Sequence, residues 1–148
     1  MSTPRALTPL FRQVYASAAV VAFVATFAPL FSPYEASESY ATMNLWSATS
    51  EMGGDNAVLG LVLMLVLVSC LFVAAAREER SPGLAVTIIT IALFGLLMLI
   101  TKPGTETPAP SLGAGGAVLL GLTILLIAAA VADVTDQVVR GLRRTREA

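Results

Sequence analysis

The sequence contains no histidine and only one cysteine, Cys70. Without histidine, the chain lacks the commonest acid–base catalyst of enzymes and the usual ligands of haem and copper. A single thiol can form neither an intrachain disulfide nor a cysteine-based metal site. We therefore expect no catalytic residues, no metal site and no cofactor, and we expect that the protein is not an enzyme.

Charged residues are also scarce, at 13% of the chain, and they are missing altogether from four long apolar runs. These runs fill just over half of the chain and cover residues 14–31, 57–76, 83–101 and 113–132. A helix of about 20 residues is about 30 Å long, which matches the hydrocarbon core of a bilayer. The pattern predicts an all-α integral membrane protein, a single domain built as a bundle of four transmembrane helices.

A cleaved signal peptide is the alternative interpretation of the first run, since basic residues precede it. Against that interpretation, Pro29 and Phe31 stand where small residues should precede a cleavage site. We therefore expect an uncleaved first helix.

The basic residues lie almost entirely on one side of the predicted helices. Eight arginines lie before the first run, between the second and third, or after the fourth, whereas Lys102 alone lies in the opposite loops. Positive charges near helix ends stay on the cytoplasmic side. We therefore expect a multi-pass protein of the bacterial plasma membrane with both termini in the cytoplasm.

Prolines that follow a capping residue mark the expected starts of two helices, at Thr8–Pro9 and at Ser81–Pro82. Only residues 77–82 separate the second and third runs, so these two helices should be antiparallel neighbours. The loop 102–112 contains three prolines and should be extended.

Small residues four positions apart mark expected contacts between helices, because close packing drives helix association in lipid. The first run carries Ala18 and Ala22, and the fourth carries Gly113, Ala117 and Gly121. Packing within the chain is the main interpretation of these positions. Self-association, or docking onto another subunit, is the alternative.

The first outer loop is rich in aromatic and methionine side chains, among them Tyr34, Tyr40, Met43 and Trp46. A short interfacial helix over residues 39–52, ended by Gly53, would place most of them on one side. Tyrosine and tryptophan favour the membrane boundary, and they are also frequent in protein interfaces. The loop is therefore expected to rest on the membrane surface or to dock a protein, with a ligand site as the remaining alternative.

Two aspartates, Asp133 and Asp136, lie where the fourth run leaves the bilayer, and Asp136 is spaced for an ion pair with Arg140. We interpret the aspartates as an interfacial acidic cluster, with a proton or cation entry site as the alternative. The tail beyond them has an apolar strip and basic residues that include Arg143 and Arg144. Such an amphipathic tail either lies on anionic lipid or binds an acidic partner.

The overall plan resembles small four-helix membrane proteins of actinobacteria, some of which resemble accessory subunits of respiratory supercomplexes. The resemblance covers the whole chain and is carried by its cytoplasmic arginine clusters, by Asn44-Leu45-Trp46 ahead of a Leu/Val-rich run, and by the tail from Arg140 to Arg146. It implies a non-catalytic role beside larger subunits of an electron-transport complex.

The first hypothesis is therefore a non-catalytic accessory subunit of a larger inner-membrane complex, with a respiratory complex as the expected host. Its partners would be larger membrane subunits and lipids, without nucleic acid or a small-molecule substrate. The expected docking residues are Tyr34, Tyr40, Met43, Trp46, Arg140, Arg143 and Arg144. A small transporter, flippase or channel component is the first alternative, with Thr87, Thr90 and Thr123 as its polar candidates. An envelope assembly or regulatory factor is the second alternative.

Overall fold

The computed structural model describes residues 7–32, 44–52, 55–77, 79, 81–101 and 111–147. The chain is mostly helical, so the predicted all-α class is confirmed. Its elements, in chain order, are α1 (Leu7–Ala25), β1 (Phe31–Ser32), α2 (Leu45–Met52), α3 (Asp55–Ala76), α4 (Pro82–Thr101), β2 (Ser111–Leu112) and α5 (Ala114–Glu147).

Three of the helices are long and apolar enough to cross a membrane, namely α3, α4 and the part of α5 up to Leu142. The apolar stretch of α1, Pro9–Ala25, is shorter. All four helices expose large apolar side chains, for example Val24, Val62, Leu97 and Ile124. A soluble protein exposes only limited apolar patches. The fold is therefore that of a membrane protein.

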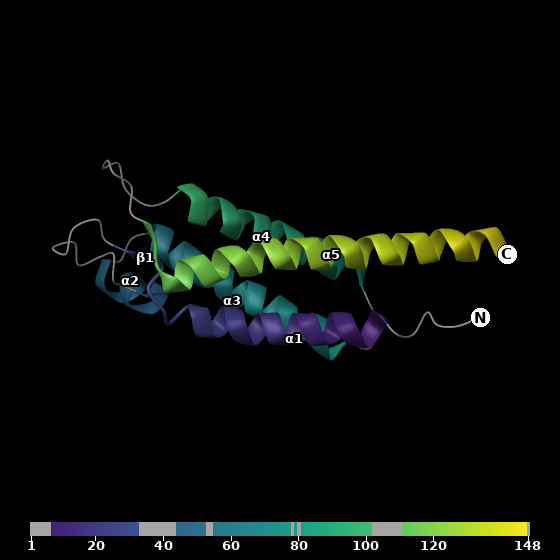
Figure 1. Ribbon diagram of the computed structural model, residues 1–148, viewed down its shortest axis with the longest axis horizontal. Coiled ribbons are helices and arrows are strands. Elements are labelled where there is room, and N and C mark those ends of the chain that lie inside the picture. Colours follow the sequence, from purple (N-terminus) through teal and green to yellow (C-terminus); the bar gives the residue numbers. More distant parts are fainter. Residues whose placement is uncertain are drawn as a thin grey trace.

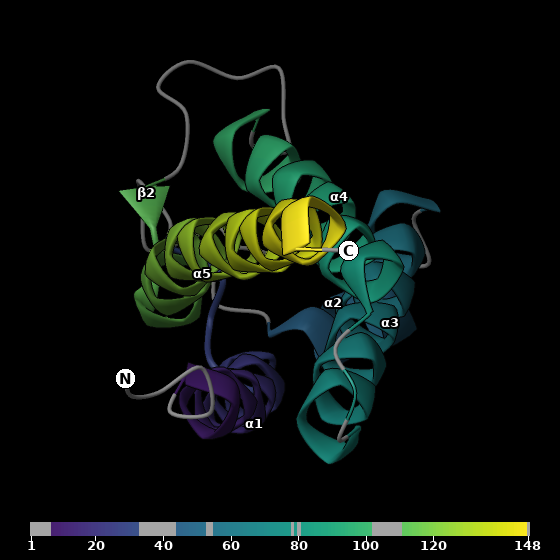
Figure 2. The same ribbon diagram turned by 90° about the vertical axis from the view of Figure 1, so that its right-hand side faces the viewer.

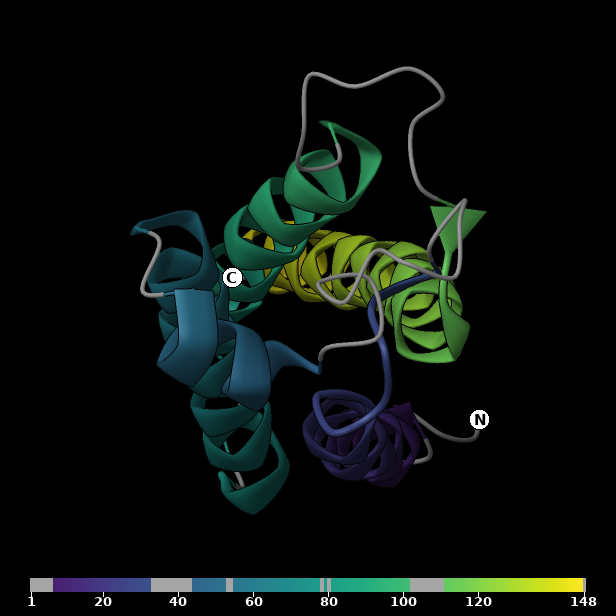
Figure 3. The same ribbon diagram turned by 90° about the vertical axis from the view of Figure 1, so that its left-hand side faces the viewer.

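The long helices run roughly along the longest axis of the molecule (Figure 1). The start of α1 and the end of α5 lie at one end, and α2 and the β1–β2 pair lie at the other. Viewed end-on, α5 lies between α4 and α1 (Figure 2), and α2 packs on α3 (Figure 3). The neighbours α3 and α4 run in opposite directions and touch, as the short link between them predicted.

The bounds of the first helix differ from the predicted ones. Helix α1 begins at Leu7, ahead of Pro9, and ends at Ala25 rather than at Phe31. At its end, the Thr26 hydroxyl donates to the carbonyl oxygen of Phe23 at 2.6 Å, and the backbone tightens into a turn. Proline disfavours a helical conformation in the residue before it, so Pro29 prevents the helix from continuing through Ala28. By contrast, α4 begins at Pro82 as predicted.

The buried core lies where α1, α3, α4 and α5 meet. Ala18 and Ala22 are both buried, and Ala18 belongs to the main apolar cluster. That cluster also contains Tyr15, Ala19, Leu67, Leu71, Ile88, Leu126 and Ala130. The small side chains of α1 therefore let this helix pack closely in the chain, as the spacing of Ala18 and Ala22 predicted.

The start of α5 is joined to the turn after α1 by three glycines, Gly113, Gly115 and Gly116, which we call the glycine joint. The Gly113 N–H donates to the Leu30 carbonyl at 2.9 Å, and the Gly115 N–H donates to the Pro29 carbonyl at 2.8 Å. Strands β1 and β2 continue this contact as an antiparallel pair. A Cβ at Gly113 or Gly115 would lie within 2.7 Å of a backbone carbonyl oxygen, so only glycine allows this approach.

Candidate functional site

Helix α5 has two faces with different surroundings. The face toward the rest of the chain is buried and contains Leu119, Thr123, Leu126, Ala130 and Asp133. The opposite face is exposed, and we call it the outer face of α5. It contains Ala117, Gly121, Ala128, Ala132 and Val139.

Two of the predicted packing residues lie on this outer face rather than at an intrachain contact. Ala117 is exposed, and a Cβ added at Gly121 would meet no other atom within 4 Å. Gly113, the third predicted residue of the fourth run, does lie in a contact, but as part of the glycine joint just before α5 begins. The prediction that Ala117 and Gly121 pack within the chain is therefore wrong, because both residues are exposed.

The five residues of the outer face form one continuous stripe. At 100° per residue their positions fall within about 60° of one another around the helix axis. Large side chains flank this stripe between Gly121 and Ala128, where Ile124 and Leu125 are exposed, and the exposed surfaces of α3 and α4 carry many more. Small residues are enriched where membrane helices approach each other closely. The outer face therefore has the composition of a helix–helix contact, although no part of the described chain covers it.

Helix α5 is longer than a crossing of the bilayer requires. A continuous helix of 34 residues is about 51 Å long, whereas about 30 Å suffices to cross the hydrocarbon core. Val139 on the outer face is 41% exposed, and the neighbouring Val138 is 53% exposed. A tail lying flat on the membrane would require a break in α5, but the helix runs unbroken from Ala114 to Glu147. Surface anchoring and partner docking of the tail both stay predictions.

The predicted ion pair between Asp136 and Arg140 is confirmed. A nitrogen of the Arg140 guanidinium lies 2.7 Å from the Asp136 carboxylate, and both side chains are partly exposed. Arg140 is therefore paired within its own helix, and its docking role stays a prediction. The side chains of Arg143 and Arg144 lie outside the described residues.

Asp133 does not share the surroundings of Asp136. It is only 4% exposed, and its carboxylate accepts hydrogen bonds at 3.2 Å from the Tyr15 hydroxyl and from the Gln137 amide. The predicted interfacial cluster of two aspartates is thus corrected, because one aspartate faces the core and the other faces outward. The sequence held one unused signal for this contact: Tyr15 lies on the same face of α1 as Ala18 and Ala22.

Trp46 is held by contacts within the chain. The Asn44 side chain caps α2 by accepting from the N–H groups of Trp46 and Ser47. The Trp46 indole N–H donates to the Thr26 hydroxyl at 2.9 Å, and its ring stacks on Phe27 with centroids 5.5 Å apart. Because the indole is half-buried and bonded to the end of α1, Trp46 anchors α2 within the chain, and its predicted docking role stays a prediction.

Helix α2 is shorter than the predicted interfacial helix, since it begins at Leu45 rather than at residue 39. Leu45 is buried and packs toward α3 near Gly60. The other predicted docking residues of the loop, Tyr34, Tyr40 and Met43, lie outside the described residues, as do Gly53 and the proline-rich stretch 102–110.

Replacing Thr26 by valine tests the anchoring role of Trp46. The variant removes the acceptor of the indole N–H, and we expect a loss of about 1 kcal/mol in the free energy of unfolding. Unfolding in detergent can be followed by the fluorescence of Trp46, the single tryptophan of the chain. Thr90→Val is the matched control, because the Thr90 hydroxyl donates only to a carbonyl of its own helix. Equal effects of the two variants would contradict the anchoring role.

The threonines considered for a polar pathway are bonded to their own helices. The hydroxyls of Thr87 and Thr90 are exposed and donate to carbonyls four residues earlier. Thr123 is buried but donates likewise to the carbonyls of Leu119 and Leu120. Each of these hydroxyls is therefore bonded within its own helix, and the transporter alternative stays a prediction.

Comparisons with protein-family models, with curated proteins and with solved structures find no match. Among the described residues, no group of three or more histidine, cysteine, aspartate and glutamate side chains could hold a metal ion. We take the outer face of α5 as the candidate functional site, because small residues are exposed along one side of this helix.

Proposed function

We propose that the chain is a non-catalytic subunit of a larger complex in the bacterial plasma membrane. In this proposal it docks onto a transmembrane helix of a partner subunit through the outer face of α5. One observation carries the proposal: four small residues and Val139, near the end of the apolar part of α5, are exposed on a single face of one helix.

Both parts of this face favour the same kind of partner. Within the bilayer, Ala117, Gly121, Ala128 and Ala132 would let a second helix approach closely and gain packing that lipid tails provide less well. Beyond the bilayer, covering Val139 removes apolar surface from water, at about 25 cal/mol per Å². A partner helix that itself continues past the membrane would cover the whole stripe.

The proposed topology has four spans, with α1 as the fourth and both ends of the chain in the cytoplasm. Exposed Val20, Phe23 and Val24 give α1 an apolar outer surface suited to lipid. The start of α1, the end of α3 and the end of α5 lie at one end of the molecule, and they carry Arg12, Arg77 and Arg140. Basic residues at one end favour a cytoplasmic location for that end.

The resemblance to accessory subunits makes an electron-transport complex the host that we propose. The tail carries Arg140, Arg143, Arg144 and Arg146 on the part of α5 beyond the membrane. We therefore propose that the partner presents acidic groups at the cytoplasmic surface, next to its transmembrane helix.

Replacing Gly121 by leucine tests the proposed docking face. A large side chain in the middle of the stripe should hold the partner helix away, and we expect at least about a tenfold weaker association, equivalent to about 1.4 kcal/mol. The measurement is purification through an N-terminal tag in a mild detergent, with co-purified subunits quantified by mass spectrometry.

Gly95→Leu is the matched control, because Gly95 of α4 also has open space around it. Wild-type protein and this control should retain the same large membrane subunits at a fixed ratio. Recovery of the wild-type chain alone would refute the subunit role. If the Gly121→Leu variant retained the partner subunits as well as the wild type does, the docking face would be refuted. If the wild-type chain were recovered with less than one partner per chain, a regulatory factor would be favoured over a subunit.

A further inference from the structure

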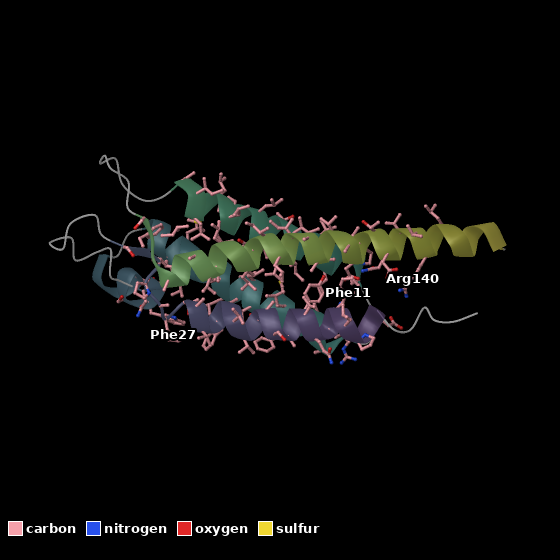
Figure 4. All side chains as sticks on the ribbon, in the orientation of Figure 1. Phe11, Phe27 and Arg140 are labelled. Carbon is pink, nitrogen blue, oxygen red and sulfur yellow. The ribbon has the colours of Figure 1, made fainter. Side chains whose placement is uncertain are left out.

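A pocket lies at the arginine-rich end of the molecule, where α1, the end of α3, the start of α4 and α5 meet. We call it the basic pocket. Its polar lining consists of Arg12, Tyr15, Arg77, Glu79, Ser81 and Asp133, and apolar side chains such as Phe11 line the rest. Phe11 and Arg140 lie toward this end of the molecule and Phe27 toward the other (Figure 4).

Two arginines stand at the mouth of the pocket. Arg12 is exposed, and its Nε donates to the Ala75 carbonyl at 2.8 Å, which fixes its guanidinium against the end of α3. Arg77, just beyond that end, is also exposed. Among the described residues, the ion pair formed by an arginine is that of Arg140 with Asp136, so neither Arg12 nor Arg77 is neutralised by a described carboxylate.

The carboxylates of the pocket do not balance these charges at the mouth. Asp133 lies in the depth of the pocket, where Tyr15 and Gln137 donate to it. Glu79 is the one acidic side chain of the lining that is exposed. Among the described residues, the exposed part of the lining therefore has two arginines and one carboxylate, which favours an anion.

The pocket lies at the depth of the lipid headgroups. Arg77 directly follows α3 and Ser81 directly precedes α4, so both mark the boundary of the apolar spans. A guanidinium matches the oxygens of a phosphate group and can bind two of them at once. Phe11 and Leu84 supply apolar contacts beside this charge. Basic pockets between membrane helices on the cytoplasmic side are suited to lipid headgroups.

We propose that the basic pocket binds the phosphate of an anionic phospholipid, with Arg12 and Arg77 as its ligands. The pocket is partly open to the surface, and its volume of about 20 Å³ holds one water molecule or one phosphoryl oxygen. The phosphate itself therefore lies at the mouth between the arginines, and the acyl chains follow the apolar surface of α1 and α4. This site is separate from the outer face of α5.

The test is native mass spectrometry of the purified full chain, titrated with phosphatidylglycerol, phosphatidylcholine or inorganic phosphate. We expect at least about tenfold greater retention of phosphatidylglycerol than of phosphatidylcholine, a difference of about 1.4 kcal/mol. Arg12→Gln/Arg77→Gln should lose this preference. Arg140→Gln should keep it, because Arg140 lies at the same end but is paired with Asp136.

Equal retention of the two lipids by the wild-type protein would overturn the proposal. Retention of phosphatidylglycerol by the double variant at the wild-type level would also overturn the proposal. Full displacement of the lipid by inorganic phosphate would overturn it as well, because the site would then be one for a free anion. Circular dichroism checks that each variant is folded. If the double variant does not fold, Arg77→Gln alone serves, because no described residue hydrogen-bonds the Arg77 guanidinium. Gly121→Leu should leave lipid retention unchanged, so the two proposals can fail separately.

Discussion

Replacing Gly116 by alanine is expected to break the contact between the start of α5 and the turn after α1. The added methyl group would overlap the carbonyl oxygen of Leu30 and would reach 3.0 Å from the Leu112 side chain. The backbone cannot yield easily, because the hydrogen bonds of Gly113 and Gly115 hold the same turn. We expect a loss of about 3 kcal/mol in the free energy of unfolding, at the upper end of the usual range for overpacking.

Thermal unfolding in detergent, followed by Trp46 fluorescence, measures this effect. Gly95→Ala is the control, since a methyl group there meets no atom within 4 Å. That variant should be as stable as the wild type or more stable by up to about 1 kcal/mol, because alanine favours a helix over glycine. If the Gly116→Ala variant and the Gly95→Ala control unfolded at the same temperature, the close approach at the glycine joint would be refuted.

Replacing Asp133 by alanine is expected to be the second large effect. The change removes a buried charged acceptor from the Tyr15 hydroxyl and from the Gln137 amide, and hydrogen bonds to charged groups contribute about 1.5–3 kcal/mol each. We expect a loss of about 3 kcal/mol in the free energy of unfolding. Asp136→Ala is the control, because its partly exposed i,i+4 pair with Arg140 contributes about 0.5 kcal/mol.

A double-mutant cycle with Tyr15→Phe isolates the contact between α1 and α5. The double variant should lose about 1 kcal/mol less than the sum of the two single variants, because residues in direct contact are coupled. The measurement is the same fluorescence-detected unfolding. Additive losses would mean that Tyr15 and Asp133 act independently, and equal losses for Asp133→Ala and Asp136→Ala would contradict the burial of Asp133.

The features predicted correctly from the sequence depend on nearby residues. The start of α4 follows from proline at its first position, and the pair of Asp136 with Arg140 follows from helical spacing. The contact between α3 and α4 follows from the short link between their apolar runs. Ala18 and Ala22 were identified because small residues in helical spacing permit close packing.

The features predicted wrongly depend on contacts between distant parts of the chain. Helix α5 has glycine or alanine on both faces, so its composition does not reveal which face meets α1 and α4. Packing buries the face with Ala130 and leaves Gly121 outside. Trp46 has an apolar ring and a polar N–H, which would suit lipid, a partner or Thr26 equally well. The position of α2 beside the end of α1 is what brings the Trp46 N–H to the Thr26 hydroxyl.

The length of α5 has a mechanical consequence. One end of the helix is fixed to the end of α1 by the glycine joint, and the other end projects past the other helices (Figure 1). A rigid rod about 51 Å long that tilts by about 5° at its fixed end moves its free end by about 4 Å. A small tilt of α5 at the glycine joint would therefore displace the far end of this helix by about the length of a side chain.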